Sequence, residues 1–157
     1  MVFGRGTDSD IDHNRLYVPA AGPLYTSLAP YAWPMLRIAL GIILITHGYP
    51  KLFQGAAQGA SRNFVAFGWA YPLAWAYFIG VVEFFGGVLL ILGLFTRIVA
   101  AAIAIEMAVI AFAVLYPHWG WTNRGMEYAL LMGLVALALF IRGAGPFSID
   151  SRLRKEF

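Results

Sequence analysis

Long apolar runs with few charges dominate the chain after residue 33. Four such runs cover about residues 35–49 (with an alternative end at 53), 73–95, 98–116 and 126–141. A helix needs ~20 residues to cross the ~30 Å hydrocarbon core, so the second and third runs suffice, whereas the other two are short without their charged ends. The alternation of apolar and polar residues that marks membrane β-strands is missing. The pattern predicts an all-α membrane protein, a four-transmembrane-helix bundle.

The segments around these runs differ in composition. Residues 1–33 are polar and proline-rich, and we expect a cytoplasmic extension whose part 24–33 lies at the membrane interface. The segment lacks the apolar stretch and cleavage site of a removable signal peptide. Residues 34–142 are predicted to form the membrane domain, with 54–71 a partly helical surface or re-entrant segment. Residues 143–157 are expected to form a basic cytoplasmic tail.

The composition supports a membrane protein. The chain is 61% apolar and only 12% charged, against roughly 25% charged in soluble domains. It has no cysteine, which excludes thiolate catalysis and cysteine-ligated iron–sulfur or zinc sites. The formal charge is +3, but the cations lie at the ends of apolar runs. They indicate topology rather than a nucleic-acid partner.

The distribution of Lys and Arg predicts the orientation. With four spans, eight cations lie on the side of the termini and three on the other side. Cytoplasmic loops carry the excess of Lys and Arg, so both termini are expected in the cytoplasm. The predicted location is therefore the inner (cytoplasmic) membrane, crossed several times.

Two carboxylates lie inside the apolar runs, Glu83 in the second and Glu106 in the third. A carboxylate at membrane depth costs about 2.5–3.5 kcal/mol on insertion scales and usually faces protein or trapped water with a partner. The sequence therefore predicts a polar site inside the membrane domain.

Depths along the helices can be counted from three flanking arginines, which we expect to reach toward the head groups: Arg37, Arg97 and Arg142. At ~1.5 Å per residue, Lys51, Glu83 and Glu127 lie ~21–22 Å from these anchors, and His47 and Glu106 ~14–15 Å. This count predicts an outer and a middle layer of ionisable groups. Lys51 and Glu83 are therefore expected to approach within ion-pair distance.

The first run contributes two of these groups, His47 and Lys51, four residues apart and so on one helix face. Pro50 removes a backbone donor, so the helix is expected to kink or stop near Tyr49. Three glutamates face one lysine and one histidine, and we expect at least one carboxyl to carry a proton.

The motifs resemble those of the DoxX family of small four-helix bacterial membrane proteins. The resemblance covers about residues 35–150 and lies in three motifs: Arg37, Gly41, His47-Gly48 and Lys51; Glu83, Gly86-Gly87, Gly93 and Thr96-Arg97; and Gly143 to Asp150. The order of small residues in the last motif, the N-terminal extension and Pro50 depart from the family pattern. The resemblance implies redox work at a quinone-containing membrane, in complexes such as thiosulfate:quinone oxidoreductases.

Each polar residue also has a structural interpretation. Glu83 and Glu106 could tie helices together, and Glu127 could cap its helix, where the dipole favours an anion. Neither haem, which would need His47 with His118, nor an iron–sulfur cluster is expected. A metal site of His47, Glu106 and Glu83 has no diagnostic spacing, so no metal is predicted.

Three functional hypotheses follow, and whether the chain is itself an enzyme stays open. The first is a subunit of a quinone-linked oxidoreductase complex that binds quinone near His47, Lys51, Glu83 and Glu127, with Glu83, Glu106 and His47 as candidate proton carriers. The second is a non-catalytic scaffold or accessory subunit, and the third a proton-coupled transporter of small solutes. The expected partners are the lipid bilayer and other membrane or redox subunits or further copies of the chain.

Overall fold

A computed structural model describes residues 12, 15–120 and 125–153. Every regular element in these ranges is helical, which confirms the all-α prediction. In chain order the elements are η2 (Pro19–Ala21), α1 (Gly22–Phe53), α2 (Ala57–Ala66), α3 (Pro72–Leu92), α4 (Thr96–Val109), the π-helical η3 (Ile110–Leu115), α5 (Glu127–Arg142) and α6 (Ile149–Leu153). The predictions for most of the polar start and for residues 154–157 fall outside the described residues.

In the part of the chain that the structure describes, three helical segments are long and apolar enough to cross a membrane: Pro19–Phe53, Pro72–Leu92 and Thr96–Leu115. The fourth apolar run forms α5, which has 16 residues. At ~1.5 Å per residue this helix is ~24 Å long, less than the ~30 Å of hydrocarbon. The protein is thus an all-α membrane protein, and its described residues include three helices of spanning length.

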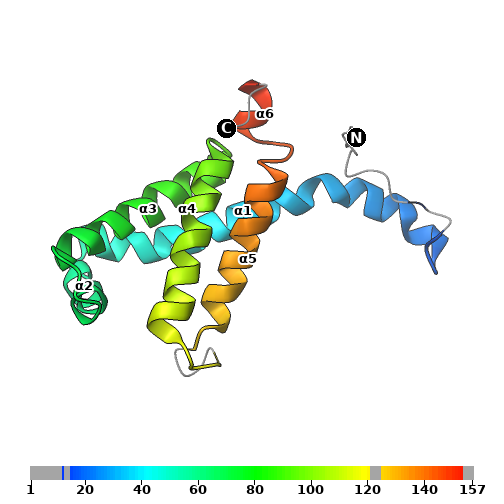
Figure 1. Ribbon diagram of the computed structural model, residues 1–157. Coiled ribbons are helices and arrows are strands. Elements are labelled where there is room, and N and C mark those ends of the chain that lie inside the picture. Colours follow the sequence, from blue (N-terminus) through cyan, green and yellow to red (C-terminus); the bar gives the residue numbers. More distant parts are fainter. Residues whose placement is uncertain (1–11, 13–14, 121–124, 154–157) are drawn as a thin grey trace, which may run out of the picture.

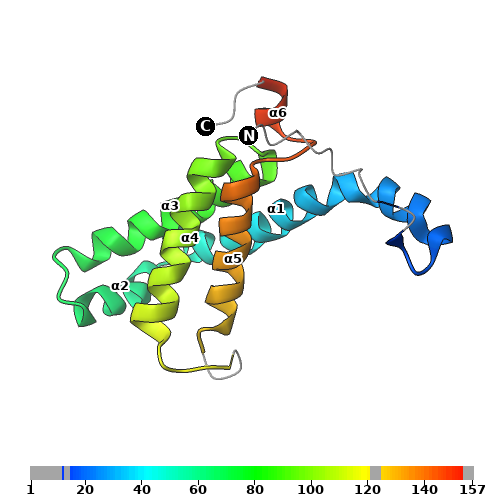
Figure 2. The ribbon, with the colours of Figure 1, turned by 45° about the vertical axis from the view of Figure 1, so that its right-hand side comes forward.

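Helix α1 is longer than the sequence predicts, with 32 residues. It begins at Gly22, so the expected interfacial lead-in is continuous with the first span, and this part projects beyond the other helices (Figures 1 and 2). Pro50 does not end the helix, which continues to Phe53, the later of the two expected ends. The φ angle of proline suits a helix, and Pro50 lies in the last turn of α1. Its cost there is the missing hydrogen bond to the carbonyl oxygen of Thr46.

The helices form two antiparallel pairs that cross each other. Helix α1 lies along α3, and α4 lies along α5, with the second pair running across the first (Figures 1 and 2). Glycines allow the backbones of the first pair to touch. A Cβ atom on Gly41 would lie 2.6 Å from the carbonyl oxygen of Gly87, and one on Gly48 would lie 2.5 Å from the backbone nitrogen of Phe84. Small residues at such crossings are typical of membrane helices.

The core lies where the two pairs cross. Its fully buried side chains come from all four helices: Leu44, Leu90, Ile103 and Leu139. The short helix α2 packs mainly against α3, at the end far from the turn between α3 and α4. The prediction that segment 54–71 is partly helical is confirmed, because α2 lies within it.

At the end of the protein that holds the turn between α3 and α4, Arg37 and Gly93 bind residues 144–150. We call this set of contacts the C-terminal clasp. Arg37 is 1% exposed, and its guanidinium donates hydrogen bonds to the carbonyl oxygens of Ala144 (2.7 Å) and Phe147 (3.0 Å). The backbone N–H of Asp150 donates to the carbonyl oxygen of Gly93. The expectation that Arg37 reaches toward lipid head groups is therefore wrong, because backbone carbonyls bind its guanidinium inside the protein.

The carboxylate of Asp150 completes this clasp. It accepts hydrogen bonds from the backbone N–H groups of Phe95 (3.0 Å) and Thr96 (2.9 Å), at the start of α4. The first N–H groups of a helix lack partners within the helix, so Asp150 caps α4 from a distant part of the chain. Asp150 itself belongs to α6, so the cap of α4 comes from another helix.

Candidate functional site

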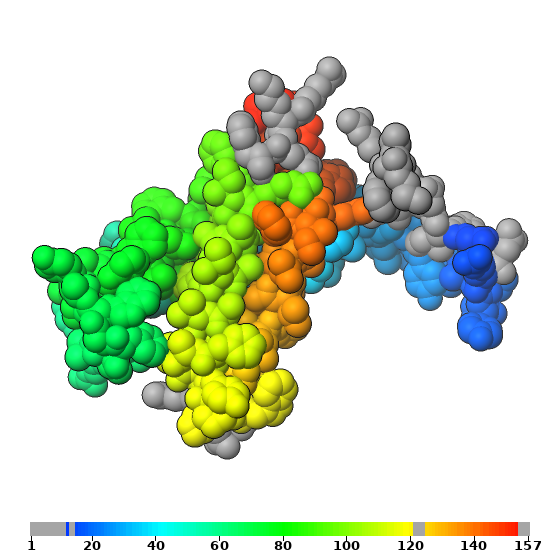
Figure 3. Space-filling model, in the orientation of Figure 1, coloured from blue at the N-terminus to red at the C-terminus, as the bar shows by residue number. Residues whose placement is uncertain are grey.

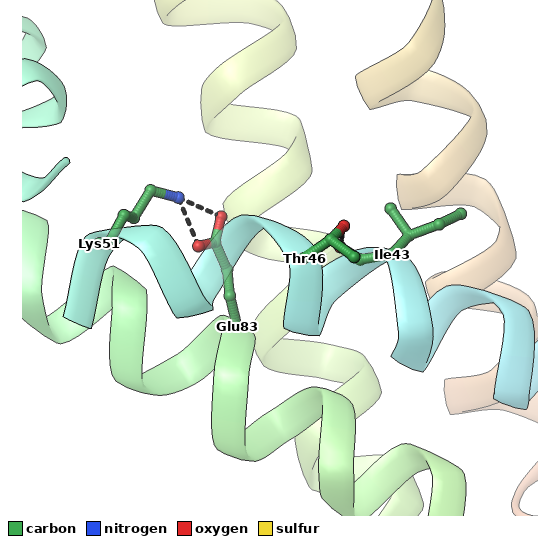
Figure 4. A network of polar contacts seen from close by, with 4 residues as sticks. All are labelled: Ile43, Thr46, Lys51 and Glu83. Atoms are coloured by element: carbon green, nitrogen blue, oxygen red, sulfur yellow. Dashed lines mark hydrogen bonds and ion pairs between the residues drawn. The ribbon is translucent and has the colours of Figure 1, made fainter. Parts of the chain in front are cut away.

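The charged side chains of Lys51 and Glu83 meet between α1 and α3 (Figure 4). The lysine ammonium donates to both carboxylate oxygens of the glutamate. The side chain of Glu83 is 4% exposed and that of Lys51 is 17% exposed. The close approach predicted from the sequence is confirmed, and neither charge is left alone among apolar side chains.

A cavity of ≈ 610 Å³ lies beside this ion pair, between the two helix pairs. Lys51, His47 and Glu83 contribute its polar wall from α1 and α3. The other side is mostly apolar, with residues of α4, η3 and α5: Met107, Ile110, Leu115, Tyr128, Ala129 and Met132. Ligand sites are typically apolar clefts of ~300–1,000 Å³ with a few placed polar groups. We call this space the ion-pair cavity.

A second cavity of ≈ 340 Å³ lies among α2, α3, α4 and η3, and Lys51 contributes to its wall. Figure 3 shows a hollow between the α2–α3 end of the molecule and α4. Its wall holds five aromatic residues together with Asn63 and Glu106: Phe64, Phe67, Trp69, Trp75 and Phe78. We call it the aromatic cavity. Lys51 of α1 and Ile110 of η3 line both cavities, so the two spaces are neighbours.

Glu106 is the most unusual polar residue in the site. It is 7% exposed, and among the described residues neither of its carboxyl oxygens has a hydrogen-bond partner. Its electrostatic neighbours are Glu83 and Lys51. A buried polar group without a partner is rare and calls for an explanation.

The candidate residues therefore do not form the two predicted layers. Glu106, expected in the middle layer, lies near Glu83 and Lys51 of the outer layer. Glu127 is the first residue of α5 and lines neither cavity. His47 and Lys51 line one cavity together, as their spacing predicts. Depth counted along α4 and α5 does not match depth along α1 and α3, because the two pairs cross (Figure 2).

Sequence reasoning missed two kinds of lining residue. Tyr128 of α5 lines the ion-pair cavity and Asn63 of α2 lines the aromatic cavity. Three aromatic residues of segment 54–71 also line the aromatic cavity, which the sequence pattern does not indicate: Phe64, Phe67 and Trp69. The sequence does offer one signal for this cavity. Asn63, a polar amide, stands next to aromatic residues in the predicted partly helical segment 54–71. Within the described ranges, no three His, Asp or Glu side chains are placed to hold a metal ion.

Comparison with known proteins identifies the family. The DoxX family model matches residues 32–116. A Bacillus subtilis protein named "Putative oxidoreductase CatD" is 38% identical over 67% of this chain and 75% of its own length. An uncharacterized Haemophilus influenzae protein is 31% identical (81% of this chain, 94% of its own length), and an uncharacterized membrane protein of Mycobacterium tuberculosis is 28% identical (83% and 94%). No solved structure matches the chain significantly. This chain belongs to the DoxX family.

Proposed function

We propose that this protein is the membrane subunit of a quinone-linked oxidoreductase complex and that the ion-pair cavity is its quinone site. The observation that carries the proposal is the position of the Lys51–Glu83 pair at the wall of an otherwise apolar cavity. A quinone ring needs an apolar slot, a hydrogen-bond donor for its carbonyl oxygens and a nearby proton carrier. The relative named as an oxidoreductase supports the same reading.

The proposal includes the arrangement in the membrane. α5 crosses as a fourth span with the help of its flanking residues, since a short span is accommodated by local thinning of the bilayer. The guanidinium of Arg97 donates to the carbonyl oxygens of Phe140 and Ile141 (2.7 and 2.8 Å), and Arg37 lies in the C-terminal clasp. These cations gather at one end of the protein, which we place at the cytoplasmic face of the inner membrane.

Three polar residues of the cavity have roles in this proposal: His47, Lys51 and Glu83. Lys51 and His47 donate hydrogen bonds to the quinone oxygens, and Glu83 holds the lysine in place. Glu83 and His47, which both line the cavity, carry the protons. Reduction of a bound quinone consumes two electrons and two protons and forms two O–H bonds. The chain has no cysteine to ligate an iron–sulfur cluster, so a partner subunit supplies the electrons.

Quinone binding by the purified protein tests the proposal. We expect a short-chain ubiquinone or menaquinone to bind the protein in lipid nanodiscs saturably, and His47→Gln to weaken binding about tenfold, the value of one hydrogen bond of ~1.4 kcal/mol. His47 is exposed to the cavity, so this change leaves the core intact. Glu127→Gln is the matched control, because Glu127 lines neither cavity. The absence of saturable binding for both quinones would refute the proposal.

The same ion pair favours a second candidate, a non-catalytic scaffold. Lys51 and Glu83 join α1 to α3, and such a contact fixes how two helices pack without doing chemistry. A scaffold predicts that Glu83→Gln lowers stability or assembly while the assembled complex keeps its turnover. A quinone subunit predicts that turnover per assembled complex falls.

A further inference from the structure

The aromatic cavity has no role in the proposed quinone site, although it contains the least satisfied polar group of the described structure. Glu106 reaches it from α4, buried and without a hydrogen-bond partner among the described residues. Its neighbour Glu83 is another carboxyl, already paired with Lys51, and among the described residues no ion pair or helix cap is formed by Glu106 itself. A ligand that supplies the missing partner would explain it.

The wall of the cavity identifies the class of ligand. Its rings already pack on one another: the centroids of Trp69 and Trp75 are 5.0 Å apart, and those of Trp75 and Phe78 are 5.8 Å apart, each pair edge to face. Trp69, Trp75 and Phe78 are 43%, 40% and 55% exposed, so ring surface remains available to a ligand. Tryptophan faces attract cations most strongly, and aromatic cages are a known means of binding quaternary ammonium groups.

The charges favour the same class. Three ionisable groups face this region: Lys51 from α1, Glu83 from α3 and Glu106 from α4. α2 contributes the neutral amide of Asn63 to the lining, and the phenol of Tyr128 lines the other cavity. The ammonium of Lys51 and the carboxylate of Glu83 neutralise each other. A bound monovalent cation would favour the ionised form of Glu106 and would balance its charge. A buried charge is stable only when it is paired.

We infer that the aromatic cavity is a binding site for an apolar organic cation, such as an aralkyl ammonium compound, held by Glu106 and the aromatic wall. A neutral apolar ring would satisfy the wall and leave the carboxylate unpaired. An inorganic cation would satisfy the carboxylate and leave the wall without a contact. Only an apolar cation matches both features.

The test compares two probes of the same shape. Benzyltrimethylammonium carries a charge, whereas neopentylbenzene has carbon in place of nitrogen and is neutral. We expect the cation to bind the protein in nanodiscs with one site and to quench the fluorescence of the cavity tryptophans, with an affinity at least about tenfold above that of the neutral probe, because charge–carboxylate and cation–π contacts add. Empty nanodiscs correct for partition into lipid.

Variants separate this site from the quinone site. Glu106→Gln keeps the shape of the side chain and should lower the affinity for the cation at least about tenfold, and Trp75→Leu should also weaken it. Glu127→Gln and His47→Gln should change it less than about twofold, because neither residue lines this cavity. Equal affinity for the two probes, or wild-type affinity in Glu106→Gln, would overturn the inference. The comparison of the two probes uses the unaltered protein, so it tests the inference even if a variant does not fold.

Discussion

The Lys51–Glu83 ion pair should show strong energetic coupling when its two members are replaced singly and together. Lys51→Met leaves the carboxylate of Glu83, whose side chain is 4% exposed, without its partner and next to Glu106. Breaking a buried pair in this way costs roughly 3–5 kcal/mol of unfolding free energy. Glu83→Gln leaves a lysine that is 17% exposed and borders both cavities, so we expect a smaller cost of about 1–3 kcal/mol.

The double variant should be less harmful than the sum of the single ones. With both charges absent, the remaining loss is one hydrogen-bonded contact between helices, worth about 1–2 kcal/mol in a membrane. The single costs together are about 4–8 kcal/mol, so the coupling free energy is about 3–6 kcal/mol, well above the roughly 0.3–0.5 kcal/mol scatter of independent sites.

Reversible unfolding in mixed micelles of a mild detergent and dodecyl sulfate, followed by helical circular dichroism, gives the four unfolding free energies of the cycle. A parallel cycle with Lys51→Met and Glu127→Gln is the control, since Glu127 lines neither cavity. If the costs of Lys51→Met and Glu83→Gln add to within about 0.5 kcal/mol, the two charges do not stabilise each other and the reasoning fails.

Three further predictions concern packing, capping and orientation. Gly48→Ala places a methyl group 2.5 Å from the backbone of α3 and should cost about 1–3 kcal/mol of unfolding free energy. Gly59→Ala is the control, because a Cβ atom there has nothing within 4 Å, and it should be neutral or stabilising. Equal effects of the two variants would contradict the close approach of α1 and α3. Asp150→Ala removes the acceptor of two N–H groups at the start of α4 and should cost about 1–2 kcal/mol, with no loss of stability as the contrary result. The chain has no cysteine, so an impermeant maleimide added to intact cells should label Gly59→Cys and should label Arg152→Cys only after lysis. The reverse pattern would invert the proposed orientation.

The sequence predicts contacts well where helices run side by side. Counting residues inward from the flanking arginines places Lys51 and Glu83 at equal depth, and the count works because α1 and α3 are antiparallel neighbours. The same count fails for Glu106 and Glu127, which lie on helices that cross the first pair. Crossing angles depend on which small residues meet, and a hydrophobic run carries little of that information.

Residues whose type suits two environments could not be placed from the sequence. An arginine at the end of a span can reach the head groups or bind carbonyl oxygens inside the protein, and Arg37 does the second. Aromatic residues near an interface can face lipid or line a cavity. Trp69 and Trp75 line one because α2 folds back against α3, a tertiary contact with no local signature.

The C-terminal clasp has a consequence for the order in which the protein can be completed during synthesis. Arg37 enters the membrane early, in α1, but the carbonyl oxygens that bind its guanidinium belong to Ala144 and Phe147, which leave the ribosome more than a hundred residues later. The same late segment supplies the carboxylate that caps α4. Until then a buried cation and a helix start both lack their partners. A chain interrupted before residue 144 would thus carry its helices together with an unpaired guanidinium, a feature by which a membrane quality-control protease could distinguish unfinished chains from finished ones.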